Sequence, residues 1–179
     1  MNHRPPTIQL GELCRRLNFP YRDARYVLEQ GLLPRGVEPK PDRGNHRQLT
    51  PAQAFWLAIV LSLKRSALKT PLAAQIAEFA RRAIRGISRN ASWDFRFSPF
   101  DGDFDTQHEW FIDVGDLTFV RVVTDANPSR TGLFEFPWFY IDRHVQAEDV
   151  APIVMIRLDI GRIARLLNTP GVPEHDRFG

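Results

Sequence analysis

The stretch LGELCRRLNFPYRDARYVLEQGLL, residues 10–33, decides the fold of the first half of the chain. Apolar side chains recur in it at helical spacing, which predicts a first helix over Leu10–Leu17 and a second over Tyr21–Gln30. Residues 18–20 interrupt the pattern and predict a short turn. Gly31 is expected to end the second helix because glycine accepts a left-handed backbone. Two short helices joined by a three-residue turn are typical of a helix-turn-helix.

The segment that follows, from Pro34 to Leu49, combines three prolines and two glycines with four basic side chains. Proline and glycine favour turns, so the segment is predicted to be a stiff, exposed loop between two short extended arms. Its basic side chains are Arg35, Lys40, Arg43 and Arg47. A basic loop of this kind after a helix-turn-helix is interpreted as a wing.

Two helix starts of the same type come after this loop. Thr50-Pro51 places Thr at the N-cap and Pro at the first helical position, where each residue type is preferred. The helix that it opens is predicted over 52–65 and is strongly apolar. Thr70-Pro71 repeats the signal, and an apolar stripe at helical spacing extends a last helix to about Arg85.

The pattern changes after Asn90 to short segments of β type. The predicted strands are 93–97, 110–114, 117–123, 133–141 and 153–158. Gly115-Asp116 is a two-residue hairpin signal, and Pro137 indicates an edge or a bulge. Asp159 is expected to cap a final helix with one apolar stripe.

The sequence therefore predicts an α+β chain of two units. A mostly helical winged helix-turn-helix domain is expected at residues 7–89. A small antiparallel β-rich domain with a terminal helix is expected at 92–169, and a flexible tail at 170–179.

The net charge of +3 hides an asymmetry between these units. Residues 1–90 hold 16 Lys/Arg and 6 Asp/Glu, whereas residues 91–179 hold 8 and 15, so the halves carry +10 and −7. A strongly basic half is the electrostatic footprint of a phosphate binder. The acidic half is expected to face a different partner.

Cysteine content and hydropathy indicate in which cellular compartment the protein is expected. Cys14 is the one cysteine, which excludes an internal disulfide and a cysteine-based zinc site; it is expected to be a buried apolar side chain. The first residues lack the apolar core of a secretory signal. The longest apolar run, 52–63, is shorter than the roughly 20 residues of a membrane span. We therefore expect a cytoplasmic, nucleoid-associated protein with no membrane partner.

The first half resembles the winged-helix domain of MerR-type transcription regulators over about residues 7–80. Leu10–Cys14 stands at the family's Ile-Gly-Glu-Leu-Ala-like helix start, and residues 18–20 stand at its turn. Arg25-Tyr26-Val27 corresponds to the Arg-Tyr-Tyr of the recognition helix, and Gly31–Pro34 to the exit from that helix. Gly44–Leu49 corresponds to the end of the wing. The resemblance implies DNA binding.

The chain also departs from this family. Pro20 replaces the Ser that caps the second helix, so we expect Asn18 to cap it instead. Val27 replaces a Tyr, which removes one hydroxyl for phosphate contact. The β-like runs after about Ser92 leave no long helix for the family's coiled-coil dimer, so a homodimer is expected to form through the β-rich half.

Seven side chains are predicted to contact double-stranded DNA: Tyr21, Arg22, Arg25, Tyr26, Lys40, Arg43 and Arg47. The resemblance implies phosphate contacts for Arg25 and Arg47, and Tyr26 can donate its hydroxyl to a phosphate. Tyr21 and Arg22 lie on the first turn of the second helix, where they can reach base edges. Lys40 and Arg43, on the wing, are expected to contact the DNA backbone or the minor groove.

Three features of the acidic half suggest a calcium site, a catalytic or metal site, or a ligand pocket, but each is incomplete or has a simpler explanation. Residues 101–105 resemble the start of a calcium loop but lack its later Gly and Glu, so a solvated loop is favoured. His108-Glu109 and Asp142-Arg-His144 complete no catalytic or metal set, so neither an enzyme nor a metal or cofactor site is expected. The aromatic side chains at alternate positions of 134–140 can line a ligand pocket or, as strand spacing favours, form plain core.

The leading hypothesis is a sequence-specific, DNA-binding transcriptional regulator of prokaryotic type. Its acidic half is expected to mediate self-association or to bind a small-molecule or protein effector. The alternative is an architectural or excisionase-like DNA binder, or an antitoxin-type interaction protein whose acidic half masks a basic toxin.

Overall fold

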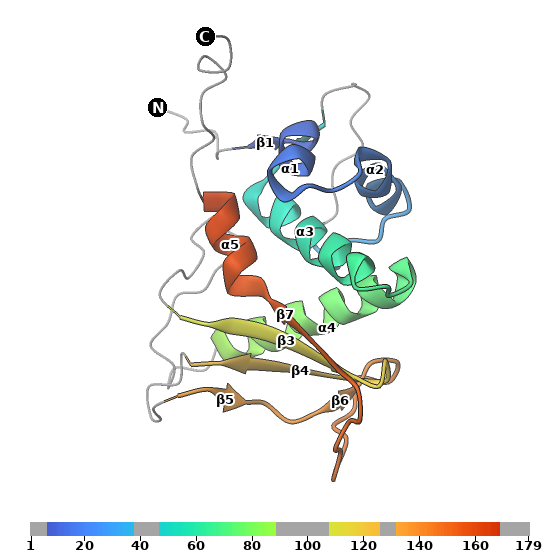
Figure 1. The fold of residues 1–179 in the computed structure, drawn as a ribbon, viewed down its shortest axis with the longest axis vertical. Coiled ribbons are helices and arrows are strands. Elements are labelled where there is room, and N and C mark those ends of the chain that lie inside the picture. Colours follow the sequence, from blue (N-terminus) through green and yellow to red (C-terminus); the bar gives the residue numbers. More distant parts are fainter. Residues whose placement is uncertain (1–6, 38–46, 89–107, 126–131, 169–179) are drawn as a thin grey trace.

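The computed structural model describes residues 7–37, 47–88, 108–125 and 132–168 (Figure 1). These residues form five helices, a two-stranded sheet and a five-stranded antiparallel sheet, a mixture of helix and sheet that is compatible with the predicted α+β class. None of the helices in this part of the chain is long and apolar enough to cross a membrane.

The first two helices are α1, Leu10–Leu17, and α2, Tyr21–Glu29. Their apolar stripes are buried as the periodicity predicts, at Leu10, Leu13, Cys14, Ala24, Val27 and Leu28. Gly31 has the expected positive φ, 63°. The bounds of both helices therefore agree with the sequence to within one residue.

The turn between α1 and α2 differs from the prediction in how it is capped. Pro20 is the N-cap of α2 and makes no side-chain capping bond, so the expectation that Asn18 caps α2 is wrong. Asn18 instead ends α1, with φ 53° and its N–H on the carbonyl of Arg15. Asparagine tolerates this left-handed conformation better than most residues, which explains its use as a C-cap.

Helix α3, Pro51–Arg65, is the centre of the molecule. Thr50 forms the predicted cap as a full capping box, with the Gln53 N–H donating to Thr50 Oγ1 and the Thr50 N–H to Gln53 Oε1. Phe55 and Trp56 are fully buried because α3 packs against α1, α2, α4 and α5. Helix α4 spans Thr70–Ser88, so it begins at Thr70 itself and extends past the predicted end.

The small sheet joins two segments that lie far apart in sequence. Strand β1, Ile8–Gln9, pairs antiparallel with β2, Gln48–Leu49. The sequence predicts two extended arms around the loop. Among the described residues only the second arm is a strand, and its partner precedes α1. The other side of the loop is a turn in which the Val37 N–H donates to the carbonyl of Pro34.

The large sheet comprises β3, Trp110–Gly115; β4, Phe119–Thr124; β5, Phe134–Glu135; β6, Phe139–Tyr140; and β7, Met155–Asp159. Its order is β5-β4-β3-β7, and β6 also pairs with β4. The single run predicted at 133–141 is instead two short strands, β5 and β6, with Pro137 between them. Both pair with β4 at one edge of the sheet, which agrees with the edge that Pro137 indicates. The predicted strand at 93–97 lies outside the described residues.

The β3–β4 hairpin forms as predicted, but its turn has three residues instead of two. Gly115 still pairs with Phe119, and the loop closes when the Thr118 N–H donates to the Gly115 carbonyl at 3.0 Å. A Cβ on Gly115 would lie 2.3 Å from a side-chain carbon of Pro152. Glycine is therefore needed here for close packing instead of for a turn.

Strand β7 starts at Met155, two residues later than predicted. The N–H groups of Ile153 and Val154 donate to the Asp116 carboxylate, which draws these residues out of the ladder. Asp159 caps the next helix, α5, Ile160–Asn168, by accepting from the Arg162 N–H at 2.7 Å. The predicted start of α5 is thus confirmed.

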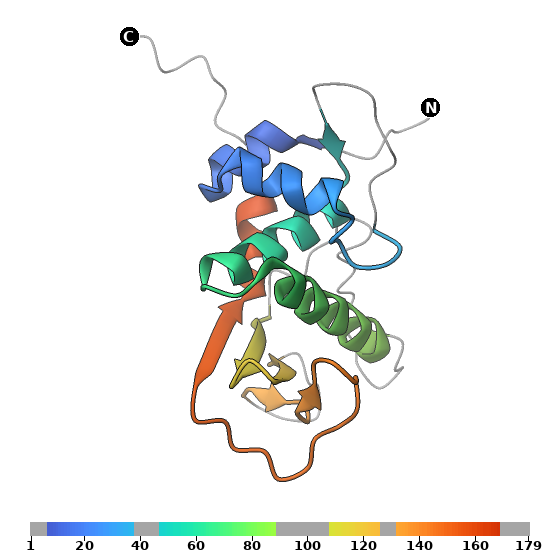
Figure 2. The same ribbon diagram turned by 90° about the vertical axis from the view of Figure 1, so that its right-hand side faces the viewer.

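Helices cover one face of the large sheet (Figures 1 and 2). Trp110, Ile112 and Val114 point from β3 into the same hydrophobic core as α1 to α5. The ring of Phe79 in α4 packs against the ring of Phe139 in β6, with the two ring centres 5.1 Å apart. Helix α5 packs against α3 and α1. The two predicted units therefore share one core, and the boundary expected near residue 90 lies outside the described residues.

Candidate nucleic-acid interface

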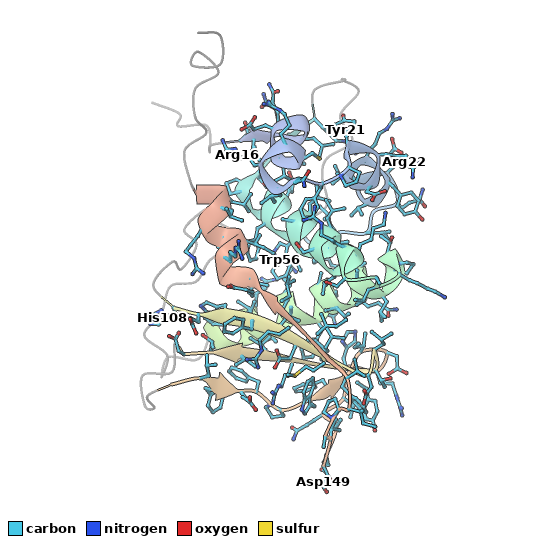
Figure 3. The ribbon with its side chains drawn as sticks, in the orientation of Figure 1. Arg16, Tyr21, Arg22, Trp56, His108 and Asp149 are labelled. Atoms are coloured by element: carbon cyan, nitrogen blue, oxygen red, sulfur yellow. The ribbon has the colours of Figure 1, made fainter. Side chains whose placement is uncertain are left out.

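The exposed face of α2 carries four of the seven predicted contact residues. Figure 3 labels two of them, Tyr21 and Arg22, on this helix. They are Tyr21, Arg22, Arg25 and Tyr26, all exposed to solvent. The opposite face of α2 packs on α1 and α3, so the helix turns this basic and aromatic surface outward. We call these four residues the α2 face.

Arg25 is not an isolated cation on the α2 face. Its Nε donates to Glu29 Oε1 at 2.5 Å, one turn later on the same helix. This hydrogen bond raises the pKa of Arg25 above its ordinary value. Exposed pairs of this type are weak, so a phosphate can compete with Glu29 for the guanidinium.

Two cations at the end of α3 contact α2 and the turn that precedes it. Lys64 Nζ lies 2.7 Å from Asp23 Oδ2 on the first turn of α2. Arg65 donates to the carbonyl of Asn18, and its guanidinium lies 4.7 Å from the centre of the Phe19 ring. Neither contact is predictable from the sequence, because no local pattern relates residues that are more than 40 positions apart.

Two further arginines lie on α1, where both contact Glu12. Arg15 Nη2 and Arg16 Nε lie 2.7 and 2.6 Å from its carboxylate oxygens. The hydrogen bond from Arg16 is the main cause that lowers the pKa of Glu12. The carboxylate therefore stays charged and offsets part of the positive charge beside the α2 face.

Arg47, the one predicted contact residue of the wing that lies among the described residues, is not brought onto α2. Arg47 is half-buried and directly precedes β2; its carbonyl accepts from the Leu10 N–H at 2.9 Å, which places it beside the start of α1. Lys40 and Arg43 lie outside the described residues. At the start of the loop, the Arg35 N–H donates to Glu78 Oε2 at 2.8 Å and anchors this segment to α4.

The outer face of the large sheet holds a different ionic group. Asp113 of β3 is fully buried, and Arg157 of β7 donates to both of its carboxylate oxygens at 2.6 and 2.7 Å. Arg121 of β4 donates to Asp113 as well and also contacts Glu135. The contact with Asp113 raises the pKa of Arg157. These side chains neutralise one another, as expected of a structural network.

The described residues contain no group of three or more His, Cys, Asp or Glu that could hold a metal ion. Asp142 and His144 are exposed in the segment after β6, where His144 stacks on Phe79. The loop with the calcium-like start, 101–105, lies outside the described part of the chain. Trp138 is buried, and the guanidinium carbon of Arg121 lies 4.4 Å from the centre of its ring. The other aromatic side chains of this segment, Phe134, Phe136 and Tyr140, are half-buried.

Comparison with known proteins finds no significant match to a protein-family model, to a curated protein or to a solved structure.

Proposed function

We propose that the chain is a sequence-specific DNA-binding regulator that reads the major groove with α2. The observation that supports this proposal is the gathering of Tyr21, Arg22, Arg25 and Tyr26 on one exposed face of α2, the second of two short helices joined by a three-residue turn, as expected of a helix-turn-helix. Second helices of such motifs insert their first turns into the groove.

The four side chains of the α2 face have two roles, base recognition and phosphate contact. Arg22 and Tyr21, on the first turn, are placed to reach base edges; a guanidinium binds guanine O6 and N7 with two hydrogen bonds. Arg25 and Tyr26, one turn later, donate to phosphates, and this contact fixes the register of the helix on the duplex. The wing residues Lys40, Arg43 and Arg47 add backbone or minor-groove contacts.

The contacts made by Lys64 and Arg65 support this use of α2. A reading helix must be held at a fixed angle to the groove, and these cations tie its first turn and the preceding turn to the buried helix α3. The described helices thus present the α2 face on a rigid base, which sequence reading requires.

The test is a binding titration on DNA from upstream of the gene, with non-specific competitor at several salt concentrations. Arg22→Ala is expected to cost about 1–3 kcal/mol on the preferred sequence and to relax the base preference. Arg25→Ala is expected to weaken binding equally on all sequences and to reduce the salt slope by about 1.

Arg143→Ala is the matched control, since Arg143 is an exposed arginine on the sheet side of the molecule. It should bind as the wild type does. If all three variants bind DNA alike, the proposed reading surface is wrong. If Arg22→Ala and Arg25→Ala lose affinity by the same factor on every sequence while Arg143→Ala does not, the protein is an architectural binder of the alternative class.

A further inference from the structure

Strand β7 forms an edge of the large sheet. One side of Met155–Asp159 pairs with β3, and no strand among the described residues pairs with the other side. Figure 2 shows β7 as the orange-red arrow at the margin of the molecule. An unpaired edge presents a row of N–H and C=O groups to which another strand can add.

The ladder shows which backbone groups face outward. The Val154 carbonyl accepts from the Asp116 N–H at 2.9 Å, so the backbone of Val154 faces β3. Backbone direction alternates along an antiparallel strand, so Ile156 and Leu158 also face β3, whereas Met155 and Arg157 face the open edge. Two residues of β7 therefore offer a donor and an acceptor each.

Exposed apolar side chains lie at the same end of the edge. The exposed fractions are 95% for Ile153, 61% for Val154, 51% for Met155 and 53% for Leu117. The Asp116 carboxylate accepts from the N–H groups of Ile153 and Val154, and Leu117 is the next residue along the chain. A partner is thus expected to be extended and partly apolar.

We propose that the occupant is β7 of a second copy, paired antiparallel about a two-fold axis at Ile156. In this register Met155 of one copy lies opposite Arg157 of the other, so the outward backbone groups of both satisfy each other. Ile156 faces its own counterpart, and Val154 faces Leu158. Val154 and Met155 thereby lose their exposure to water.

Charge and hydrogen bonding select this register. Centring the pair on Arg157 would place two like charges directly opposite, which is unfavourable. Centring it on Met155 would require the Ile153 N–H, which is already donated to Asp116 at 3.2 Å. At the chosen register Arg157 remains neutralised by Asp113, so pairing buries no unmatched charge.

The pairing does not depend on DNA binding, although a two-fold dimer suits a DNA site with two half-sites. Sedimentation equilibrium without DNA measures it directly. Wild type and Met155→Ala are expected at twice the 20.6 kDa chain mass, and Met155→Pro at one chain mass. Proline removes the outward donor and leaves the bonds to β3 intact. A monomeric wild type, or a dimeric Met155→Pro, overturns the proposal.

Cysteine cross-linking tests the register. Ile156→Cys is expected to give a disulfide-linked dimer under mild oxidation, because directly opposed non-hydrogen-bonded residues have Cα atoms about 4.5 Å apart. Leu158→Cys, on the same face, is the matched control and should give no disulfide-linked dimer under the same oxidation, because Leu158 lies opposite Val154 and not opposite its own counterpart. The native Cys14 is buried and its pKa is raised by burial, so it should not react. A linked Leu158→Cys with an unlinked Ile156→Cys overturns the register.

Discussion

The exposed face of α2 and the outer face of the large sheet both carry arginines, but the two groups have different surroundings. Arg22 and Arg25 are open to water, and Arg25 has one exposed partner. Arg121 and Arg157 hold a fully buried carboxylate between them. Burial and partners, more than charge, separate a surface available to a ligand from a structural network.

The largest expected effect is on the sheet side of this comparison. Asp113→Asn removes the buried charge and leaves two arginines without their shared partner, so the free energy of unfolding should fall by about 3–5 kcal/mol. Urea denaturation of Asp142→Ala, which removes an exposed ion pair with Arg143, is the control and should shift by less than about 1 kcal/mol. Equal shifts would mean that Asp113 adds no more than a surface charge.

A smaller effect is expected at the hairpin that holds this network. Gly115→Ala places a methyl group against Pro152, so the segment before β7 must move, at a cost of about 1–3 kcal/mol in thermal or urea unfolding. Gly11→Ala in α1 meets no atom within 4 Å and should be neutral or stabilising. A neutral Gly115→Ala would contradict the close packing of hairpin and loop.

The smallest expected effect concerns the α2 face. Glu29→Gln releases Arg25 and removes a negative charge from the proposed DNA surface, so DNA affinity at low salt should rise about two- to fivefold. The gain should shrink as salt is raised. Glu148→Gln, an exposed acid after β6, is the control. If it increases affinity equally, the effect reflects net charge alone.

Elements with local signals were predicted well. Thr50 and Asp159 accept the capping bonds expected of them, and the buried positions of α1, α2 and α5 follow the apolar stripes. The pairing of β1 with β2 was not predicted, because the two strands are separated by about 40 residues and each has only two. The three-residue hairpin turn was not predicted, because Gly115 is a strand residue that packs closely on Pro152 and not a turn residue.

In the candidate site, too, features with a local signal were predicted and features that depend on distant contacts were not. The helical period predicted that Arg22, Arg25 and Tyr26 lie outside the core, and all three are exposed. The role of Arg25 came from the resemblance to a known family, and those of Tyr21 and Arg22 from their place on the first turn. Lys64, Arg65 and their partners were missed because ion pairs between helices depend on how the helices pack.

The sequence by itself therefore determined the helices, their buried faces and the exposed basic surface of α2, since capping and periodicity act within a few residues. Only the tertiary structure decided that Asp113 is buried between Arg121 and Arg157, and that β7 is the last strand of the sheet within the described part of the chain. Both depend on strand order and register, which are set by contacts between residues distant along the chain.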